Sequence, residues 1–232
     1  MIKKLLLTSA LLASHLFAFS ATNIQYLYGN FEGPTFLDTQ HGDKQTITAE
    51  HYRTWEYGDM FMFADYTYAK GRLQFTDHKN DLYGEFSPRL SLNKMMHIPT
   101  SRGLIKEWYG AYQHNRSDSY RANLYGLGSD LNIPGFDVLG LNVYRKIQNI
   151  GNDTYQLSAN YSITLSERWH FEGFTDWTTV DFLTQDQLLF NLAPSLGITA
   201  GKLEIGTEWH YYHENTYHQD NDVFQAMVKY SW

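Results

Sequence analysis

The sequence predicts an all-β fold, a transmembrane antiparallel up-and-down β-barrel of about twelve strands. Three observations lead to this prediction. The chain opens with an export signal, many of its later segments alternate between apolar and polar residues, and its composition is aromatic yet polar. There are 18 Tyr, 14 Phe and 6 Trp residues, but the mean hydropathy is −0.46. A barrel with an apolar outer face, a polar lumen and aromatic rims has this composition.

The first twenty residues have the three parts of a secretory signal peptide. Met1–Lys4 is short and basic, Leu5–Phe17 is mainly apolar, and Ala18-Phe19-Ser20 places small residues at positions −3 and −1 of a cleavage site. The apolar run is too short for a spanning helix. A short core helix is the alternative, but no cap or amphipathic stripe supports it. We therefore predict a signal peptide over 1–20 and a β-barrel over 21–232.

Composition excludes several classes of function. Without its first twenty residues the chain has 16 basic and 25 acidic residues, a formal charge of −9, whereas nucleic-acid binding needs a basic face. The chain contains no cysteine, which excludes disulfides, thiol catalysis and thiolate metal sites. After the signal no apolar stretch approaches twenty residues, so helical spanning is excluded.

Alternation with a period of two is strongest in the segments 82–93, 153–165 and 203–212. Cutting the chain at its turn residues predicts twelve strands, an even number as expected for a bacterial barrel, with ten and fourteen as alternatives. The predicted strands are 23–31, 46–57, 60–70, 81–94, 103–114, 120–131, 136–147, 153–165, 168–177, 186–198, 203–213 and 222–232.

The predicted connections alternate in length. Tight turns are expected at 58–59, 132–135, 166–167 and 199–201, with a somewhat longer turn at 95–102. Mostly longer, polar loops are expected at 32–45, 71–80, 115–119, 148–152, 178–185 and 214–221. This asymmetry favours short periplasmic turns and longer outer loops, and an even strand count then puts both termini at the periplasmic end.

The last predicted strand alternates Phe224, Ala226, Val228, Tyr230 and Trp232 with other residues. This ending resembles the C-terminal strand that outer-membrane barrels present to their assembly machinery, which we expect to be a partner. The alternative is a soluble β-sandwich, but a sandwich would hide its aromatic residues in one core. Here aromatic residues occur on almost every predicted strand.

Several segments, in the same order along the chain, resemble the nucleoside-specific channel-forming porins of Gram-negative outer membranes, the Tsx and OmpK-like family. They are Asn23–Gly29 through Gly33-Pro34, Glu85–Leu92, Lys106–Tyr109, Gly126–Asp130, Leu141–Tyr144 with Lys146, Gly173–Trp177 and Glu208–Tyr211. The resemblance implies a twelve-stranded barrel with a narrow pore that passes nucleosides. It also implies a location in the outer membrane, in contact with lipid and lipopolysaccharide.

Alternation places a first set of polar and aromatic side chains in the lumen: Glu85, Arg89, Asn142, Tyr144, Lys146, Glu204, Glu208 and His210. The resemblance, with weaker alternation, adds Glu50, Tyr52, Phe61, Phe63, Asp65, Glu107, Tyr109, Asp130, His170, Glu172, Phe174 and Asp176. Charged residues within strands are expected inside, because an Arg or Lys on the lipid face costs about 2–4 kcal/mol at the midplane. These side chains are candidates for the permeation path or, alternatively, for ion pairs that only brace the wall.

Such a lumen suits nucleosides, since aromatic rings can stack on a base and carboxylates, amides and Arg can match ribose hydroxyls. The sequence predicts a monomeric passive channel with no cofactor. A barrel with a plugged lumen, acting as an adhesin or structural protein, is one alternative, and a rim-active barrel enzyme is another. No spacing marks a nucleophile. His210, His213 and His218 flank a loop, and we expect solvated side chains there, not a metal site.

Overall fold

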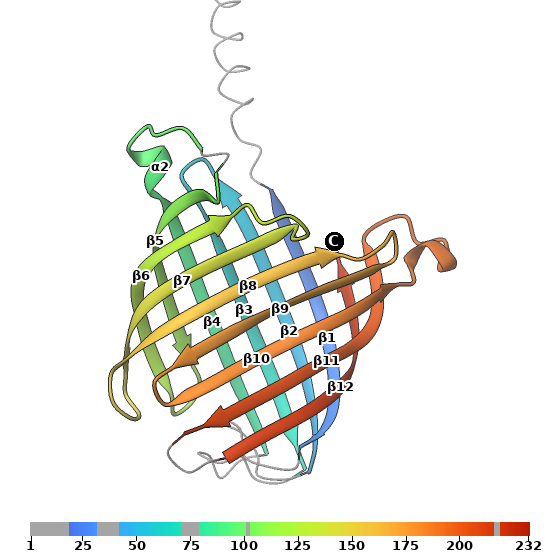
Figure 1. Cartoon of the computed structure of the whole chain (residues 1–232). Helices are drawn as coiled ribbons and strands as arrows, with labels where there is room; N and C mark the ends of the chain where they lie inside the picture. The colour runs from blue at the N-terminus through green and yellow to red at the C-terminus, as the bar shows by residue number, and fades with distance from the viewer. Residues whose placement is uncertain (1–18, 32–41, 71–78, 101–102, 216–218) are drawn as a thin grey trace, which may run out of the picture.

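A computed structural model describes residues 19–31, 42–70, 79–100, 103–215 and 219–232, which form one closed barrel of tilted strands (Figure 1). The predicted fold class and the predicted number of strands, twelve, are confirmed. Residues 1–18 of the predicted signal peptide lie outside the described residues, and the first strand already includes Ser20. The strands are β1 Ser20–Phe31, β2 Gly42–Trp55, β3 Gly58–Ala69, β4 Asn80–Ser91, β5 Ile105–Arg116, β6 Arg121–Leu131, β7 Val138–Gln148, β8 Thr154–Thr164, β9 Trp169–Thr178, β10 Asp181–Asn191, β11 Lys202–Glu214 and β12 Gln219–Ser231.

Pairing of the first and last strands closes the barrel. Each strand is antiparallel to its neighbours in sequence, and β1 pairs with β12 along a register that sets Tyr26 opposite Val228. At the end of this seam the Thr22 N–H donates to the Trp232 carbonyl at 3.1 Å, and the Trp232 N–H donates back at 2.9 Å. Both ends of the barrel sequence therefore meet at one rim, as predicted. We call this rim the termini end.

The two faces of the wall follow the predicted alternation. On β11 the inward Glu204, Glu208 and His210 are 2%, 4% and 5% exposed, whereas the outward Ile205 is 42% exposed. Leu203 and Trp209 are half-exposed on the same outward face. The predicted facing of this strand is confirmed, and a shift of one residue would have inverted it.

The predicted asymmetry in connection length is wrong. At the termini end, 92–104 contains helix α2 (Leu92–Met95), and 192–201 contains the 3₁₀ helix η1 (Ala193–Leu196). At the opposite end, β9 and β10 are joined by residues 179–180 alone. Within the described residues, no helix is long and apolar enough to cross a membrane.

Local effects explain why β4 and β10 end before their predicted last residues. Strand β4 ends at Ser91 and not at residue 94, because the Ser91 hydroxyl accepts the Lys94 N–H at 3.0 Å and caps α2. Strand β10 spans 181–191 and not 186–198, because Pro194 in the first turn of η1 lacks an N–H and Gly197 ends this helix with a φ of 69°.

The turn between β2 and β3 is also displaced from its predicted position. Glu56 and Tyr57 form it, while the predicted turn residues Gly58 and Asp59 belong to β3. Gly58 is required sterically, since a Cβ there would lie 2.0 Å from the Arg89 carbonyl oxygen on β4. This close approach leaves the side chain of Asp59 beside that of Arg89 inside the barrel.

Several charged residues depart from the expectation that strand charges point inward, and Asp186 of β10 is one of them. The register sets Asp186 in one row with Gly173, Tyr161 and Trp209, which places it on the outer face. The Tyr161 and Thr184 hydroxyls donate to its carboxylate. Gly173 leaves the space, because a Cβ there would lie 2.5 Å from a carboxylate oxygen of Asp186. Hydrogen bonds from these two hydroxyls, and the space left by Gly173, thus offset the unfavourable desolvation of a carboxylate on the outer face.

Substitution of Gly58 tests the packing of the start of β3, beside the β2–β3 turn, against the end of β4. We expect Gly58→Ala to lower the free energy of unfolding by about 1–3 kcal/mol, because the new methyl group meets backbone. Gly110→Ala is the matched control: Gly110 also pairs with Leu90, and its Cβ would meet only the flexible end of Leu92 at 3.8 Å. Denaturant unfolding of both variants measures the difference, and equal midpoints would contradict the steric account.

Candidate functional site

The barrel encloses a cavity of about 880 Å³ lined by residues of all twelve strands. It extends from the turn 132–137 at the termini end to Lys44 and Thr67, which lie near the opposite ends of β2 and β3. Fourteen of the twenty residues expected in the lumen line it: Glu50, Tyr52, Phe61, Phe63, Asp65, Glu85, Arg89, Asp130, Asn142, Tyr144, Glu172, Phe174, Asp176 and Glu208.

The other six candidates contact the lining residues or the inner wall without lining the cavity. Glu107 accepts the Ser91 hydroxyl, and Tyr109 lies under the Arg89 guanidinium. Lys146 lies over the Tyr120 ring at 5.9 Å. His170 and Glu204 contact each other at 3.1 Å, and the His210 ring packs edge-on against Phe31 at 5.5 Å between centroids.

Arg89 organises one side of the cavity. Its Nε and Nη2 donate to the two oxygens of Asp59 at 2.8 and 2.6 Å, and its Nη1 donates to Asp130 at 3.0 Å. The Tyr109 hydroxyl donates to the second oxygen of Asp130 at 2.9 Å, and the Tyr109 ring lies 4.2 Å from the guanidinium carbon. The planar fork of Arg suits this bidentate contact, so the group is rigid.

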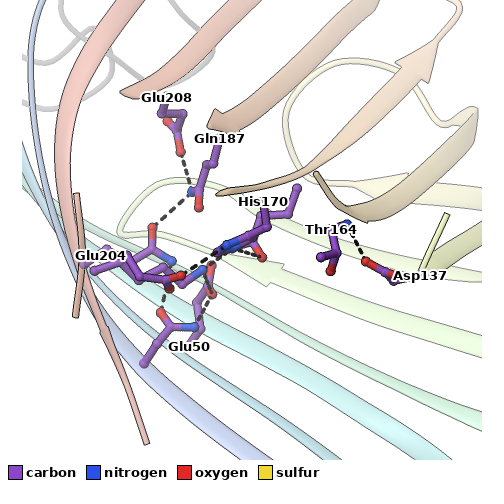
Figure 2. Close-up of polar contacts among 11 residues, drawn as sticks. Glu50, Asp137, Thr164, His170, Gln187, Glu204 and Glu208 are labelled. Atoms are coloured by element: carbon purple, nitrogen blue, oxygen red, sulfur yellow. Dashed lines mark hydrogen bonds and ion pairs between the residues drawn. The ribbon is translucent and has the colours of Figure 1, made fainter. Parts of the chain in front are cut away.

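A second charged group surrounds Lys229 of β12. Lys229 donates to Glu172 and lies 3.8 Å from Glu50. His170 continues this group, since its Nε2 is 3.3 Å from Glu172 and its Nδ1 is 3.1 Å from Glu204 (Figure 2). Strands β2, β9, β11 and β12 are therefore joined across the interior near the seam.

Other carboxylates of the cavity accept hydrogen bonds from neutral groups. Glu208 accepts the amides of Gln187 and Gln225, each at 2.9 Å, and Figure 2 shows Gln187 next to Glu208. The Gln187 amide also donates to Gln25 of β1 at 3.1 Å. Glu85 accepts the Tyr83 hydroxyl and, at 2.8 Å, the Gln113 amide. These carboxylates are held in place but keep lone pairs that other donors can reach.

An aromatic row lies on the wall formed by β3 and β4. The ring centroids of Phe61 and Phe63 are 6.0 Å apart, and those of Phe63 and Tyr83 are 5.9 Å apart. Hydrogen-bonding residues flank each ring of β3. Glu50 and Glu85 lie on either side of Phe63 in the register, and Tyr52 and Ser87 lie on either side of Phe61. Ring faces and acceptors therefore alternate along one wall.

Two apolar clusters fill part of the remaining interior. The first consists of Ala111, Tyr120, Ala122, Leu124 and Tyr144, all at most 7% exposed. The second consists of Leu27, Leu189 and Met227. Both clusters point inward and reduce the open cross-section, so the cavity is narrower than an empty twelve-stranded barrel would allow.

Several cavity residues were not among the candidates. Asp59 lies in a predicted turn, and Gln185 lies in a predicted loop because the predicted strand begins only at residue 186. Gln187 lies within that predicted strand, whose alternation is too weak to assign an inner face. Four others are Gln225 and Lys229, on the polar face of the last strand, and Asn23 and Gln25, on the polar face of the first. The predictions from sequence rest only on the apolar face of the last strand and on no alternation in the first. Assigning the polar positions of the first and last strands to the lumen would have identified Asn23, Gln25, Gln225 and Lys229.

No group of three or more His, Asp or Glu side chains in the described part of the chain is placed to hold a metal ion. His213 contacts Asp220 and Asn215 at the rim, and His210 contacts Gln185. His218, the third histidine considered, lies outside the described residues.

Comparison with known proteins gives a family match over almost the whole chain. The family model described as "Nucleoside-specific channel-forming protein, Tsx" matches residues 19–231. A relative of that name from Klebsiella pneumoniae is 34% identical over 116 residues, which is 41% of this chain and 40% of the relative. One from Salmonella typhimurium is 28% identical over 171 residues, 65% of this chain and 58% of the relative.

The chain thus spans between two fifths and three fifths of the length of these curated relatives. Among solved structures, the KdgM porin superposes with a TM-score of 0.53 at 10% identity, covering 90% of this chain and 99% of that protein. At this identity the likeness concerns the barrel fold alone.

Removal of Arg89 tests the first charged group. We expect Arg89→Met to lower the free energy of unfolding by about 3 kcal/mol, because the largely buried carboxylates of Asp59 and Asp130 lose their counter-ion. Arg89→Lys should restore part of the loss, since it keeps the charge without the fork. Lys70→Gln is the control: its pair with Asp43 lies at the surface, with the lysine side chain 77% exposed, and no measurable change is expected. Equal unfolding midpoints for Arg89→Met and Lys70→Gln would refute the structural role of Arg89.

Proposed function

We propose that this protein, which belongs to the family of nucleoside-specific channel-forming proteins of the Tsx type, is a passive channel for small polar solutes and that nucleosides are its preferred solutes. The family match covers residues 19–231, and the family and the barrel fold locate the protein in the outer membrane of Gram-negative bacteria. No covalent chemistry is needed for this role.

The observation that carries the proposal is the aromatic row Phe61–Phe63–Tyr83 with Glu50 and Glu85 beside its central ring. A nucleoside has one flat apolar part, the base, joined to one hydroxyl-rich part, the ribose. Stacking of a base on a protein ring contributes about 1–3 kcal/mol. A carboxylate accepts hydrogen bonds from ribose hydroxyls at the same time. The row therefore matches both halves of the solute within one stretch of wall.

Weak, repeated sites suit transport better than one tight site. Conduction requires binding that is favourable enough for entry and weak enough for exit. Phe61 and Phe63, which both line the cavity, offer successive rings 6.0 Å apart, so a base can pass from one ring to the next. The proposed mechanism is thus diffusion along a ladder of similar contacts, with no energy input.

The charge of the cavity favours nucleosides over nucleotides. Nine acidic and four basic residues line it. Arg89 and Lys229, two of the four cations, already bind carboxylates of the wall. A phosphate group entering this field meets mainly negative charge, whereas a neutral nucleoside does not. We therefore propose exclusion of phosphorylated solutes and a preference for cations among small ions.

The open cavity favours a channel over the two alternative functions. A plugged adhesin barrel would fill its interior, but about 880 Å³ is open between the inner clusters. A rim-active enzyme would need a nucleophile and base near one end, whereas the charged groups around Arg89 and Lys229 lie along the inner wall. The channel proposal uses those groups directly.

We also propose that residues 1–20 direct secretion and that the barrel inserts into the outer membrane as a monomer through the assembly machinery. The outward Phe224, Val228 and Tyr230 of β12 are exposed in the barrel, together with Trp232. This apolar row of the last strand is the surface we propose the machinery recognises. The same outer wall then contacts lipid and lipopolysaccharide.

The stacking role is tested by single-channel current with adenosine or thymidine titrated in. We expect Phe63→Ala to raise the half-blocking concentration about 5- to 100-fold, which corresponds to about 1–3 kcal/mol of lost stacking, with little change in open-channel conductance. Phe86→Ala is the matched control, because Phe86 lies on the neighbouring strand but faces outward. Glu85→Gln should instead reduce cation selectivity.

Two outcomes would contradict the nucleoside assignment. One is a wild-type half-blocking concentration in the Phe63→Ala channel. The other is block by glucose or arginine as strong as block by nucleosides in the wild-type channel. Either result would leave a general small-solute porin.

A further inference from the structure

We propose that the connection between β4 and β5 is a membrane anchor that inserts into the phospholipid leaflet at the termini end and prefers anionic headgroups. The anchor consists of the apolar Met95, Met96, Ile98 and Leu104 together with Lys94, and we call it the α2 patch. Figure 1 shows α2 beyond the ends of β4 and β5, at the margin of the barrel. The proposal concerns the rim and is independent of what passes through the lumen.

The α2 patch exposes its apolar side chains strongly. Met95, Met96, Ile98 and Leu104 are 54%, 60%, 49% and 63% exposed. Four large apolar residues gathered on one connection, away from the strands, leave an apolar surface that water covers poorly. In a flexible loop such residues could turn inward and become buried. The apolar surface is therefore stable only if the backbone of the connection is rigid.

Hydrogen bonds fix the backbone of this connection. The Met96 N–H donates to the Leu92 carbonyl at 3.0 Å, and the Ile98 N–H donates to the Asn93 carbonyl at 2.8 Å. The buried Asn93 side chain accepts the Trp108 N–H of β5 at 2.9 Å, which ties α2 to the barrel wall. The exposed methionines are therefore displayed by an ordered turn.

His97 adds a backbone observation. Its φ of 56° is the only positive value among the non-glycine residues that the structure describes. This left-handed conformation is uncommon for a residue with a Cβ and costs of order 1 kcal/mol or more. The turn keeps this conformation although glycine stands at all the other positive-φ positions described. The turn that exposes Met96 and Ile98 therefore forms even though the left-handed backbone of His97 is energetically unfavourable.

Continuity with the lipid-facing wall points to lipid as the occupant. Outward Leu90 of β4 and Trp108 of β5 are 47% and 46% exposed, and they lie on the two strands that α2 connects. The apolar surface of the wall therefore continues through Leu104 into the α2 patch. A Trp between an apolar wall and a polar rim also occupies the level that membrane interfaces favour.

Charge identifies the kind of lipid. From Leu92 to Leu104 the sequence contains two cationic residues and no acidic one, in a chain whose formal net charge is −7. Three other connections at the same end each include an acid: Glu56, Asp137 and Glu167. An apolar surface with cationic neighbours binds in the interface of an anionic bilayer, where each cation contributes about 1 kcal/mol. Lys94 is exposed beside the methionines and can reach a headgroup phosphate.

The absence of cysteine from the chain makes a direct test possible. The Met96→Cys variant, carrying an environment-sensitive dye, is reconstituted in phosphatidylcholine vesicles with and without phosphatidylglycerol. Glu56→Cys with the same dye is the control, since it lies in an exposed turn at the same end. We expect lipids with a quencher on the upper acyl chain to quench the Met96→Cys dye at least threefold more than the control. Adding phosphatidylglycerol should increase this quenching, and Lys94→Gln should remove the increase.

Three results would overturn the proposal. The first is equal quenching of both dyes by lipid, with equal access for aqueous iodide. The second is protection of the Met96→Cys dye from iodide without lipid quenching and only at high protein density, which would mean that a second copy covers the patch. The third is lipid quenching that does not depend on phosphatidylglycerol or on Lys94, which would refute the preference for anionic headgroups. Resistance of each variant to unfolding in detergent verifies that the barrel has formed.

Discussion

The rest of the structure depends on the hydrogen-bonded seam between β1 and β12. In hydrocarbon an unpaired N–H or carbonyl costs several kcal/mol, so a sheet can span the bilayer only if it has no edge. The seam removes the edge, from Tyr28 opposite Ala226 to Asn23 opposite Ser231. Closure then divides side chains strictly between two environments, because successive residues of a strand point to opposite faces. The polar interior is thus a consequence of closure.

A closed interior of this size has to balance its own charges. Carboxylates from β2, β3, β6 and β9 point into the same space, and Arg89 and Lys229 each bind two of them. The two cations hold different parts of the wall together and leave other carboxylates, such as Glu85 and Glu208, with neutral partners. Apolar clusters fill further space. What remains is a narrow cavity with a fixed aromatic row on one side. The selectivity of the cavity follows from the space that the ion pairs and apolar clusters do not fill.

Alternation predicted much of this arrangement from sequence, and its failures have physical causes. The faces of β11 were predictable because Glu204, Glu208 and His210 alternate with apolar residues over the whole strand. The start of β10 was not, because Asp181 and Thr184 resemble loop residues and only their pairing with β9 and β11 makes them strand. Asp186 violates the rule of inward charge because Gly173, a neighbour in space, makes room for it. In both cases, the start of β10 and the outward Asp186, the outcome depends on residues of the neighbouring strands. The pairing register that brings those residues together is not visible in a single sequence.

The central claim is that closure makes the inner face of the wall a water-filled path for solutes. Single cysteines at positions 60–66 of β3 test it in reconstituted channels, since the natural chain has no cysteine to interfere. The account predicts that a water-soluble thiol reagent modifies positions 61, 63 and 65, which line the cavity, and reduces the current through the channel. Positions 60, 62 and 66 should resist this reagent and respond to quenchers in the lipid. Modification without alternation, or modification of positions 61, 63 and 65 with no effect on current, would contradict the account.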